Sequence, residues 1–581
     1  MNIENYDEAY LVVKNLPISD DGKYIFYILE NGLKIFVKYS EKPHFYILKK
    51  SIINKIIKIQ CFFSEGGEKK KIELGEICYN DIKVTRGFVN FEYSTIISKG
   101  YKSFDGKKTF DLNKLDWKLG PDHNFNFNIH ALRFLSSFWG EYLKTFNILY
   151  IKRALHIFID FWKSINSLKI DKFKRYDMAV GIRALHLYFL SHFKEHFSQE
   201  ESQIFEQIFD FHLEELSKPN VITQNNHGIW QVYGLRLLIL ARGDKNTLLL
   251  NQCNVELKKL LDFSFNEEGI HVENSPFYHN YVVDLFNFLP KSLFSLNKLN
   301  GVLKDKSEFL FWFTDKNHQY FQIGDSHGGV NKTYSLQNLH ADFNINGVDF
   351  YSKIYKKSGY LVIKSNNAND ALIVSCTNDS LVHKHADNMS FILWHKGVEL
   401  ITDSGLYAYT YDEYRDYFIS DKAHNVLSLK GKVLTPKDIC PHKSFLEDFF
   451  IGNEFYTLRG KSSYNGFEYL RDFEYKPTKE ISIKDTILEN VFDLDYSFIL
   501  NFPPTVDIVH ENGLVLLLLN NKIFGTIKCD TVYKEILVYK GNKKPIRGWV
   551  SKKYNNLEPS CSIEYVFNHD TPEILVDIKL I

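Results

Sequence analysis

The sequence predicts a multidomain α+β protein in which a small β-rich part comes first, an all-α domain second and an antiparallel β-sandwich third. Its 581 residues exceed what a single hydrophobic core supports. Two changes in periodicity set this order. Short alternating runs give way near Leu115 to apolar residues at three- and four-residue spacing, and short alternating runs return after Asn346. We therefore expect domains at residues 1–105, 106–335 and 336–581.

The first part contains three β-branched and aromatic runs, at residues 24–30, 32–39 and 58–63. Asn-Gly, Lys-Pro and Gly-Gly turns separate them, which is typical of antiparallel strands. This part carries no group of residues that indicates chemistry.

The second part contains five segments of helical length with amphipathic spacing. They cover residues 134–142, 146–165, 176–193, 203–216 and 227–241. Helices are expected to continue to about Phe313.

The third part contains short runs bounded by Gly, Asn, Asp and Pro, the texture of an antiparallel sandwich. They lie at residues 360–364, 371–376, 391–394, 497–501, 513–519 and 535–539.

Composition narrows the class of partner. Lys plus Arg equal Asp plus Glu at 71 each, so global charge gives no reason to expect nucleic acid or an anionic membrane. The seven cysteines are odd in number and scattered, which favours free thiols. No apolar run is long enough to span a membrane, and the first residues lack the pattern of a secretory signal. A cytoplasmic protein is expected, with export by another route left open.

Residues 382–429 concentrate titratable side chains between two expected strands. His383, His385, Asp403 and His424 are the nitrogen and oxygen donors that zinc accepts. An expected hairpin, with strands at 390–394 and 398–403 around a turn at 395–397, returns Asp403 toward His385. If extended, His383 and His385 would share one face. Surface or hydrogen-bonded histidines are the open alternative.

Two further clusters lie in the helical part. Asn226 and His227 open an expected helix, where an amide, an imidazole and free backbone N–H groups suit a carboxylate. The alternative is that Asn226 only caps that helix. Tyr278 lies in a polar and aromatic segment, residues 273–281, and a tyrosine can transfer protons. The chain has 35 tyrosines, so Tyr278 carries little weight alone.

Taken together and in this order, the three clusters resemble the heparinase II/III family of polysaccharide lyases, to which some alginate lyases are related. The resemblance covers roughly Trp117 to the C-terminus. It implies an (α/α) toroid, at residues 106–335, joined to an antiparallel β-sandwich, at residues 336–581.

The resemblance also implies roles for individual residues. Asn226 and His227 would bind the uronate carboxylate, Tyr278 would protonate the leaving glycosidic oxygen, and His383 would be the catalytic histidine. Tyr414 would be a further active-site tyrosine, with Tyr409 and Tyr411 competing for that role. His385, Asp403 and His424 would bind zinc. Lys384 departs from the family pattern, which has a small residue between the two histidines, and is expected to change the charge of a subsite.

These roles amount to β-elimination on a uronate-containing acidic polysaccharide, leaving an unsaturated uronate end. Two alternatives stay open. One is glycoside hydrolysis by paired carboxylates drawn from Asp387, Asp403, Glu273 and Asp325. The other is a non-catalytic glycan-binding or assembly protein of a capsule or exopolysaccharide pathway.

Overall fold

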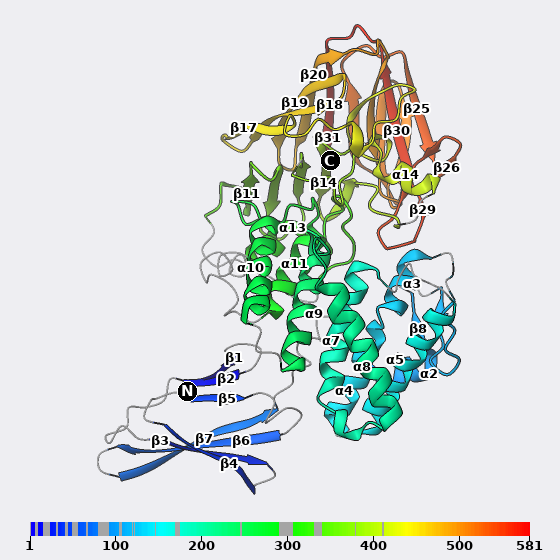
Figure 1. The fold of residues 1–581 in the computed structure, drawn as a ribbon. Helices are drawn as coiled ribbons and strands as arrows, with labels where there is room; N and C mark the ends of the chain where they lie inside the picture. The colour runs from blue at the N-terminus through cyan, green and yellow to red at the C-terminus, as the bar shows by residue number, and fades with distance from the viewer. Residues whose placement is uncertain are drawn as a thin grey trace. The chain divides into compact units, whose positions relative to one another are not determined.

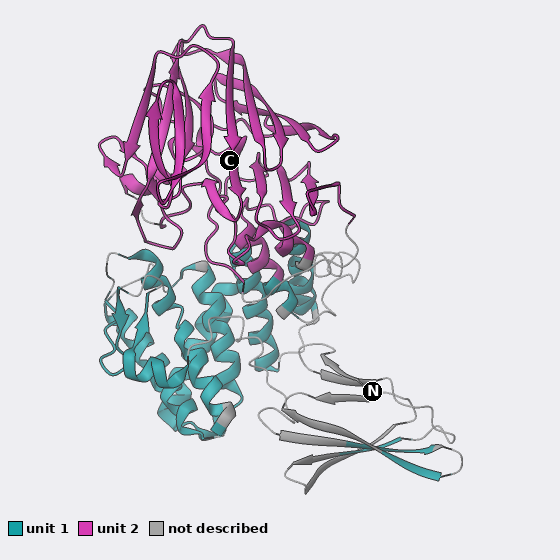
Figure 2. Cartoon of the chain, turned by 180° about the vertical axis from the view of Figure 1, so that it is seen from behind, with its two compact units in different colours: residues 1–263, 284–300 teal, residues 264–283, 301–581 magenta. Residues whose placement is uncertain are grey.

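The chain divides into two compact units in its computed structural model (Figure 2). Residues 1–263 and 284–300 form the first unit, and residues 264–283 and 301–581 form the second. The predicted domain boundaries stay a prediction. The structure describes residues 2–5, 10–14, 24–30, 33–40, 45–48, 56–65, 68–78, 92–103, 107–118, 120, 122–145, 147–168, 175–243, 247–289, 306–330, 340–377, 379–409 and 412–581.

The first unit begins with antiparallel strands. One sheet has three strands, β1 (Asn2–Asn5), β2 (Tyr10–Lys14) and β5 (Phe45–Leu48). Another has four, in the order β4 (Leu33–Ser40), β3 (Tyr24–Glu30), β6 (Ile56–Glu65) and β7 (Glu68–Cys78). A short pair, β8 (Tyr101–Lys102) and β9 (Thr109–Phe110), follows. The three predicted strands are confirmed as β3, β4 and β6.

Among the residues that the structure describes, the other main elements of the first unit are α-helices (Figure 1). They are α2 (Tyr93–Lys99), α3 (His123–His130), α4 (Ser136–Thr145), α5 (Leu149–Ser167), α7 (Asp177–Ser191), α8 (Gln199–Leu216), α9 (Asn226–Arg242) and α10 (Thr247–Ser264). The five predicted helices are confirmed as α4, α5, α7, α8 and α9. A capping box between Ser198 and Glu201 fixes the start of α8. Closure of the helices into a toroid stays a prediction.

Two helices precede the sheets of the second unit, α11 (Pro276–Phe288), whose first two turns belong to it, and α13 (Lys306–Phe313). The expected continuation of helices to Phe313 is confirmed. None of the helices in the described parts of the chain is both long and apolar enough to cross a membrane.

Three larger antiparallel sheets follow in the second unit, besides two two-stranded ones. The six-stranded sheet runs in chain order, with β10 (Phe343–Ile345), β11 (Val348–Tyr355), β12 (Tyr360–Ser365), β13 (Ala371–Ser375), β14 (Ser390–His395) and β15 (Val398–Ile401). The four-stranded sheet has the order β16 (Leu427–Leu429), β21 (Tyr496–Asn501), β30 (Cys561–Phe567) and β25 (Glu535–Lys540). The eight-stranded sheet has the order β17 (Phe445–Ile451), β18 (Tyr456–Tyr464), β19 (Phe467–Lys476), β20 (Glu480–Asn490), β31 (Glu573–Leu580), β24 (Lys522–Cys529), β23 (Leu514–Leu519) and β22 (Asp507–Glu511).

The three sheets share one hydrophobic core. It includes Phe391 of the six-stranded sheet, Phe498 of the four-stranded sheet and Phe473 of the eight-stranded sheet, all at most 2% exposed. The six predicted strands are confirmed as β12, β13, β14, β21, β23 and β25. The chain is therefore a mixed helix and sheet protein with an antiparallel sheet region at its C-terminal end, as predicted.

Candidate active site

A buried aspartate, Asp325, lies at the centre of a polar cluster in the second unit. It is 1% exposed. Its Oδ2 accepts a hydrogen bond from His383 Nδ1 at 2.7 Å, and its Oδ1 accepts one from His385 Nε2 at 2.9 Å. Arg415 donates to both oxygens, from Nη1 at 2.8 Å and from Nη2 at 3.0 Å. Burial opposes ionisation, but Arg415 and the two histidines hold the pKa of Asp325 well below its ordinary value. Three donors therefore share one carboxylate.

The backbone beside Asp325 has no room for a side chain. Gly324 has φ +53°, and a Cβ there would lie 2.6 Å from the carbonyl oxygens of both Asn274 and His383. Asn274 Nδ2 in turn donates to the carbonyl oxygen of Val382 at 3.0 Å. Glycine thus allows the segments before Tyr278 and around His383 to meet at the aspartate.

The two histidines reach Asp325 by a path that differs from the expected strand. His383 has φ 56°, so the backbone turns there and is not extended. The hairpin that follows is the expected one, with Lys396 and Gly397 at φ 49° and φ 76° joining β14 to β15. His385 bonds Asp325, which the sequence does not place near it.

Tyr278 lies against the catalytic-histidine candidate. It is the third residue of α11, and its ring stacks on the ring of His383 with 3.5 Å between centroids and 15° between planes. Its hydroxyl shares a 2.7 Å hydrogen bond with the hydroxyl of Tyr409. Burial raises the pKa of Tyr278 and of Tyr409, so both phenols keep their protons at neutral pH.

A second carboxylate approaches the other nitrogen of His383. Glu273 is 3% exposed, and its Oε2 lies 3.6 Å from His383 Nε2 and 3.3 Å from His271 Nε2. His383 therefore lies between Asp325 at Nδ1 and Glu273 at Nε2.

Tyr409, and not Tyr414, is the tyrosine that the structure brings to Tyr278. Tyr414 lies on α14 (Glu413–Ile419), and its ring packs against those of Tyr407 and Trp549 at 6.0 and 5.8 Å. Arg415, the next residue on α14, lies 5.5 Å from the Tyr409 ring. The Tyr414 ring packs against an apolar cluster, and the active-site role expected for Tyr414 stays a prediction. Tyr411 lies outside the described residues.

The segment that carries Tyr409 is held by a stretch close to the C-terminus. Ser551 N donates to Ser404 O at 2.8 Å, and Asn555 N donates to Tyr407 O at 2.7 Å. The Tyr554 ring lies 5.9 Å from the Tyr409 ring. The position of the second phenol therefore depends on residues 551–555.

The two histidines among the three predicted zinc ligands each pair with a carboxylate. His424 Nδ1 donates to Asp403 Oδ2 at 2.6 Å, as His385 Nε2 does to Asp325. The two imidazole rings lie 5.2 Å apart, and their other nitrogens, His385 Nδ1 and His424 Nε2, are buried without a hydrogen-bond partner. Imidazoles paired in this way with carboxylates fit zinc. Asp403 serves His424, however, and no group of three or more His, Cys, Asp or Glu side chains in the described part of the chain is arranged around a metal.

Lys384 does not add charge to an exposed subsite, contrary to the expectation. It is 3% exposed, and its ammonium group bonds the carboxylate of Asp387. The positive charge of Lys384 is therefore paired with the negative charge of Asp387 in the interior of the second unit, although Lys384 lies between His383 and His385 in the sequence.

A buried arginine supports the cluster from the eight-stranded sheet. Arg471 makes two 2.7 Å hydrogen bonds to Asp485, and its Nη1 donates to Met389 O at 3.0 Å and to Asn425 O at 2.7 Å. These carbonyls belong to the segments that carry His385 and His424. One side chain thus fixes both segments.

Asn226 and His227 begin α9 in the first unit. The N-cap is Asn225, whose Oδ1 accepts from His227 N at 2.9 Å, so the alternative that Asn226 is the cap is off by one residue. Asn226 is 6% exposed, and the His227 ring lies 6.1 Å from that of Tyr176. Their role at the same sugar ring as Tyr278 stays a prediction.

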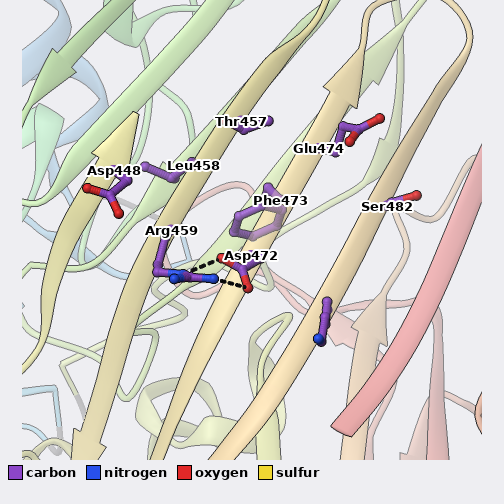
Figure 3. Close-up of a pocket in the computed structure, with 9 residues that line it drawn as sticks. Asp448, Thr457, Leu458, Arg459, Asp472, Phe473, Glu474 and Ser482 are labelled. Carbon is purple, nitrogen blue, oxygen red and sulfur yellow. Dashed lines mark hydrogen bonds and ion pairs between the residues drawn. The ribbon is translucent and has the colours of Figure 1, made fainter. Parts of the chain in front are cut away.

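A cavity of about 460 Å³ is lined by other residues, which belong to β17, β18, β19 and β20 (Figure 3). Arg459 and Asp472 form a two-bonded ion pair across it, at 2.7 and 3.1 Å. None of the candidate site residues lines it, so it does not compete as the catalytic centre.

Comparison of the sequence with known families and proteins gives two findings. Residues 349–576 match the family described as Heparinase II/III-like, C-terminal. No curated protein matches the chain in sequence.

Solved structures with the same fold cover most of the chain. A structure of heparinase III is 15% identical, with a TM-score of 0.63 over 86% of this chain and 85% of that one. The heparinase III BT4657 gene product is 14% identical, with a TM-score of 0.58 over 87% and 85%. Heparan sulfate lyase HepC from Pedobacter heparinus is 14% identical, with a TM-score of 0.54 over 86% and 82%. At these identities the likeness shows a shared fold.

Proposed function

Because residues 349–576 match the family described as Heparinase II/III-like, C-terminal, we propose that this protein is a polysaccharide lyase. It cleaves a uronate-containing acidic polysaccharide by β-elimination. The names of the structural neighbours, heparinase III and heparan sulfate lyase, favour a glycosaminoglycan as substrate.

The observation that carries the proposal is the Tyr278 phenol stacked on the His383 imidazole and hydrogen bonded to Tyr409. β-Elimination needs a base for the C5 proton and an acid for O4 within one sugar ring of each other. An imidazole and a protonated phenol in contact meet both needs. A hydrolase would instead need two carboxylates flanking the bond with room for water.

The proposed elimination moves one proton to His383 and one from Tyr278. His383 Nε2 takes the C5 proton, the electron pair forms the C4–C5 double bond, the C4–O4 bond breaks, and Tyr278 donates its proton to O4. The imidazolium that forms is stabilised by Asp325, 2.7 Å from Nδ1, and Glu273, 3.6 Å from Nε2. Burial raises the pKa of Tyr278, which suits a proton donor and favours His383 as the base.

Asn226 and His227 are the residues that we propose neutralise the uronate carboxylate. The C5 proton becomes removable only when hydrogen-bond donors offset the charge that builds up on that carboxylate. Both residues lie in the first turn of α9, where backbone N–H groups and the helix dipole favour an anion.

We also propose that zinc occupies the site of His385, Asp403 and His424. His385 Nδ1 and His424 Nε2 are the nitrogens that would hold it, and Asp403 orients His424. The ion would supply a fixed positive charge that pins the loop after His383. Metal analysis of the purified protein and of His424→Ala, with the melting temperature of each before and after chelation, tests this. Zinc in the wild type alone, with a chelator-induced drop in its melting temperature, is the expected result.

The activity is tested by incubating the protein with heparan sulfate and with alginate. An ultraviolet chromophore from the new C4–C5 double bond is expected with at least one of them. Tyr278→Phe should reduce its rate of appearance by roughly 10²- to 10⁴-fold. New reducing ends without the chromophore would indicate hydrolysis, and retention of the polymer without cleavage would indicate a binding protein.

A further inference from the structure

One carboxylate controls the hydrogen bonding of two histidines in the second unit. Asp325 accepts from His383 at Oδ2 and from His385 at Oδ1, while the Arg415 fork occupies the remaining side of both oxygens. At 1% exposure the carboxylate is closed to bulk solvent. Each oxygen therefore has a fixed pair of donors.

This bonding fixes where the imidazole protons are. An ionised carboxylate can only accept, so His383 must carry its proton on Nδ1 and His385 must carry its proton on Nε2. The neutral forms then leave lone pairs on His383 Nε2 and His385 Nδ1. His383 Nε2 is the nitrogen not used by Asp325, and His385 Nδ1 is buried without a hydrogen-bond partner.

We propose that Asp325 is a positioning residue that sets the tautomer and the ring plane of His383, and through Arg415 holds the helix that follows Tyr409. The kinetic part of this inference rests on the proposed lyase activity. A carboxylate that orients a catalytic imidazole contributes through the imidazole and not through the substrate, so its loss lowers kcat and leaves KM nearly unchanged.

Ring orientation gives the role a further geometric basis. The His383 plane lies 15° from that of Tyr278 with centroids 3.5 Å apart, an arrangement that rotation about the His383 side chain would destroy. The 2.7 Å bond to Asp325 is the shortest polar contact of that ring among the described residues. It opposes such a rotation.

The chain offers a matched control. Asp370 and His395 form another buried pair, in which Oδ1 of Asp370 lies 2.8 Å from Nδ1 of His395. Asp370 is 6% exposed and His395 is 0% exposed. The pair joins the ends of β13 and β14 and contacts none of the candidate catalytic side chains. Asp370→Asn therefore repeats the chemical change of Asp325→Asn without touching His383.

Kinetics form the first part of the experiment. Asp325→Asn is expected to lower kcat roughly 10²- to 10⁴-fold with KM within about threefold of wild type. Asp370→Asn, at a similar loss of melting temperature, is expected to keep kcat within about twofold. A folded Asp325→Asn protein with wild-type kcat would overturn the proposal, as would equal losses of kcat in the two variants.

Tautomer measurement forms the second part and needs no activity. Long-range ¹H–¹⁵N spectra of wild-type protein labelled at histidine, with His383 assigned by His383→Gln, should give the Nδ1–H form of His383. Asp370→Asn should leave that signal unchanged. An Nε2–H signal for His383 in the wild type would refute the role of Asp325. If no polysaccharide gives an unsaturated product, the lyase proposal fails while this readout still decides the positioning role.

Discussion

Tyr409 and Tyr414 lie close in sequence, yet their side chains have different surroundings. The hydroxyl of Tyr409 bonds that of Tyr278 at 2.7 Å, whereas the ring of Tyr414 packs on Tyr407 and Trp549. Tyr409→Phe removes the partner of the proposed acid and is expected to lower kcat by about 10-fold, the value of one hydrogen bond. Tyr414→Phe is the matched control and should stay within about twofold. Initial rates on the same polysaccharide measure both, and a larger loss in Tyr414→Phe would support the assignment of Tyr414 made from sequence.

The ion pair of Lys384 with Asp387 makes a prediction about stability. Both side chains are buried, so Lys384→Ala would leave a carboxylate in the interior without its cation. We expect the free energy of unfolding to fall by about 3–5 kcal/mol in urea denaturation. Adding Asp387→Asn removes the orphaned charge and should recover part of the loss. If the double variant is no more stable than Lys384→Ala, the two side chains do not act as a pair.

At the scale of elements, the turn at Gly324 is where three segments meet. Alanine there would meet two carbonyl oxygens at 2.6 Å and would also need φ +53°. We expect Gly324→Ala to lower the free energy of unfolding by well over the ~1–2 kcal/mol that a left-handed residue alone would cost. We also expect it to lower activity, because Asp325 and His383 would move apart. Gly513→Ala is the control, because Gly513 has φ +77° and a Cβ there would meet no described atom within 4 Å. Similar unfolding midpoints for the two variants would mean that the backbone at Asn274 and His383 can shift without loss of stability.

For the whole molecule, we expect Lys364 to make the free energy of unfolding depend on pH. Its ammonium nitrogen donates to the carbonyl oxygens of Phe311 and Thr314 at 2.7 Å each, and burial lowers its pKa to about 7. Between pH 7 and its ordinary pKa, the unfolded chain binds a proton that the folded chain does not, so stability rises with pH.

Lys364→Met removes this contribution. Relative to the variant, the wild type should gain up to about 1.4 kcal/mol of unfolding free energy per pH unit above pH 7. Urea denaturation of both proteins at several pH values between 7 and 10 measures the difference. Parallel curves would show that Lys364 keeps its charge in the folded state.

The sequence predicts the elements well because periodicity is local, and the six-stranded sheet follows chain order. The candidate site is harder to predict from the sequence, because its contacts join residues that are far apart in the chain. Asp325 meets its donors 58, 60 and 90 residues away, and only a resemblance could have linked it to them. From sequence, Asp325 is only one of several carboxylates that a hydrolase could use. Likewise, residue spacing does not predict that the Lys384 side chain is buried, because this depends on the turn in the backbone at His383.

The hydrogen bonds from Ser551 and Asn555 to the segment carrying Tyr409 have a consequence for biosynthesis. A ribosome makes the stretch around Tyr278 and His383 long before it makes these two residues. The nascent chain therefore lacks the anchor for the phenol of Tyr409 until residues 551–555 have been added. An enzyme built in this order would be kept inactive while the roughly 140 residues after Tyr409 are being made.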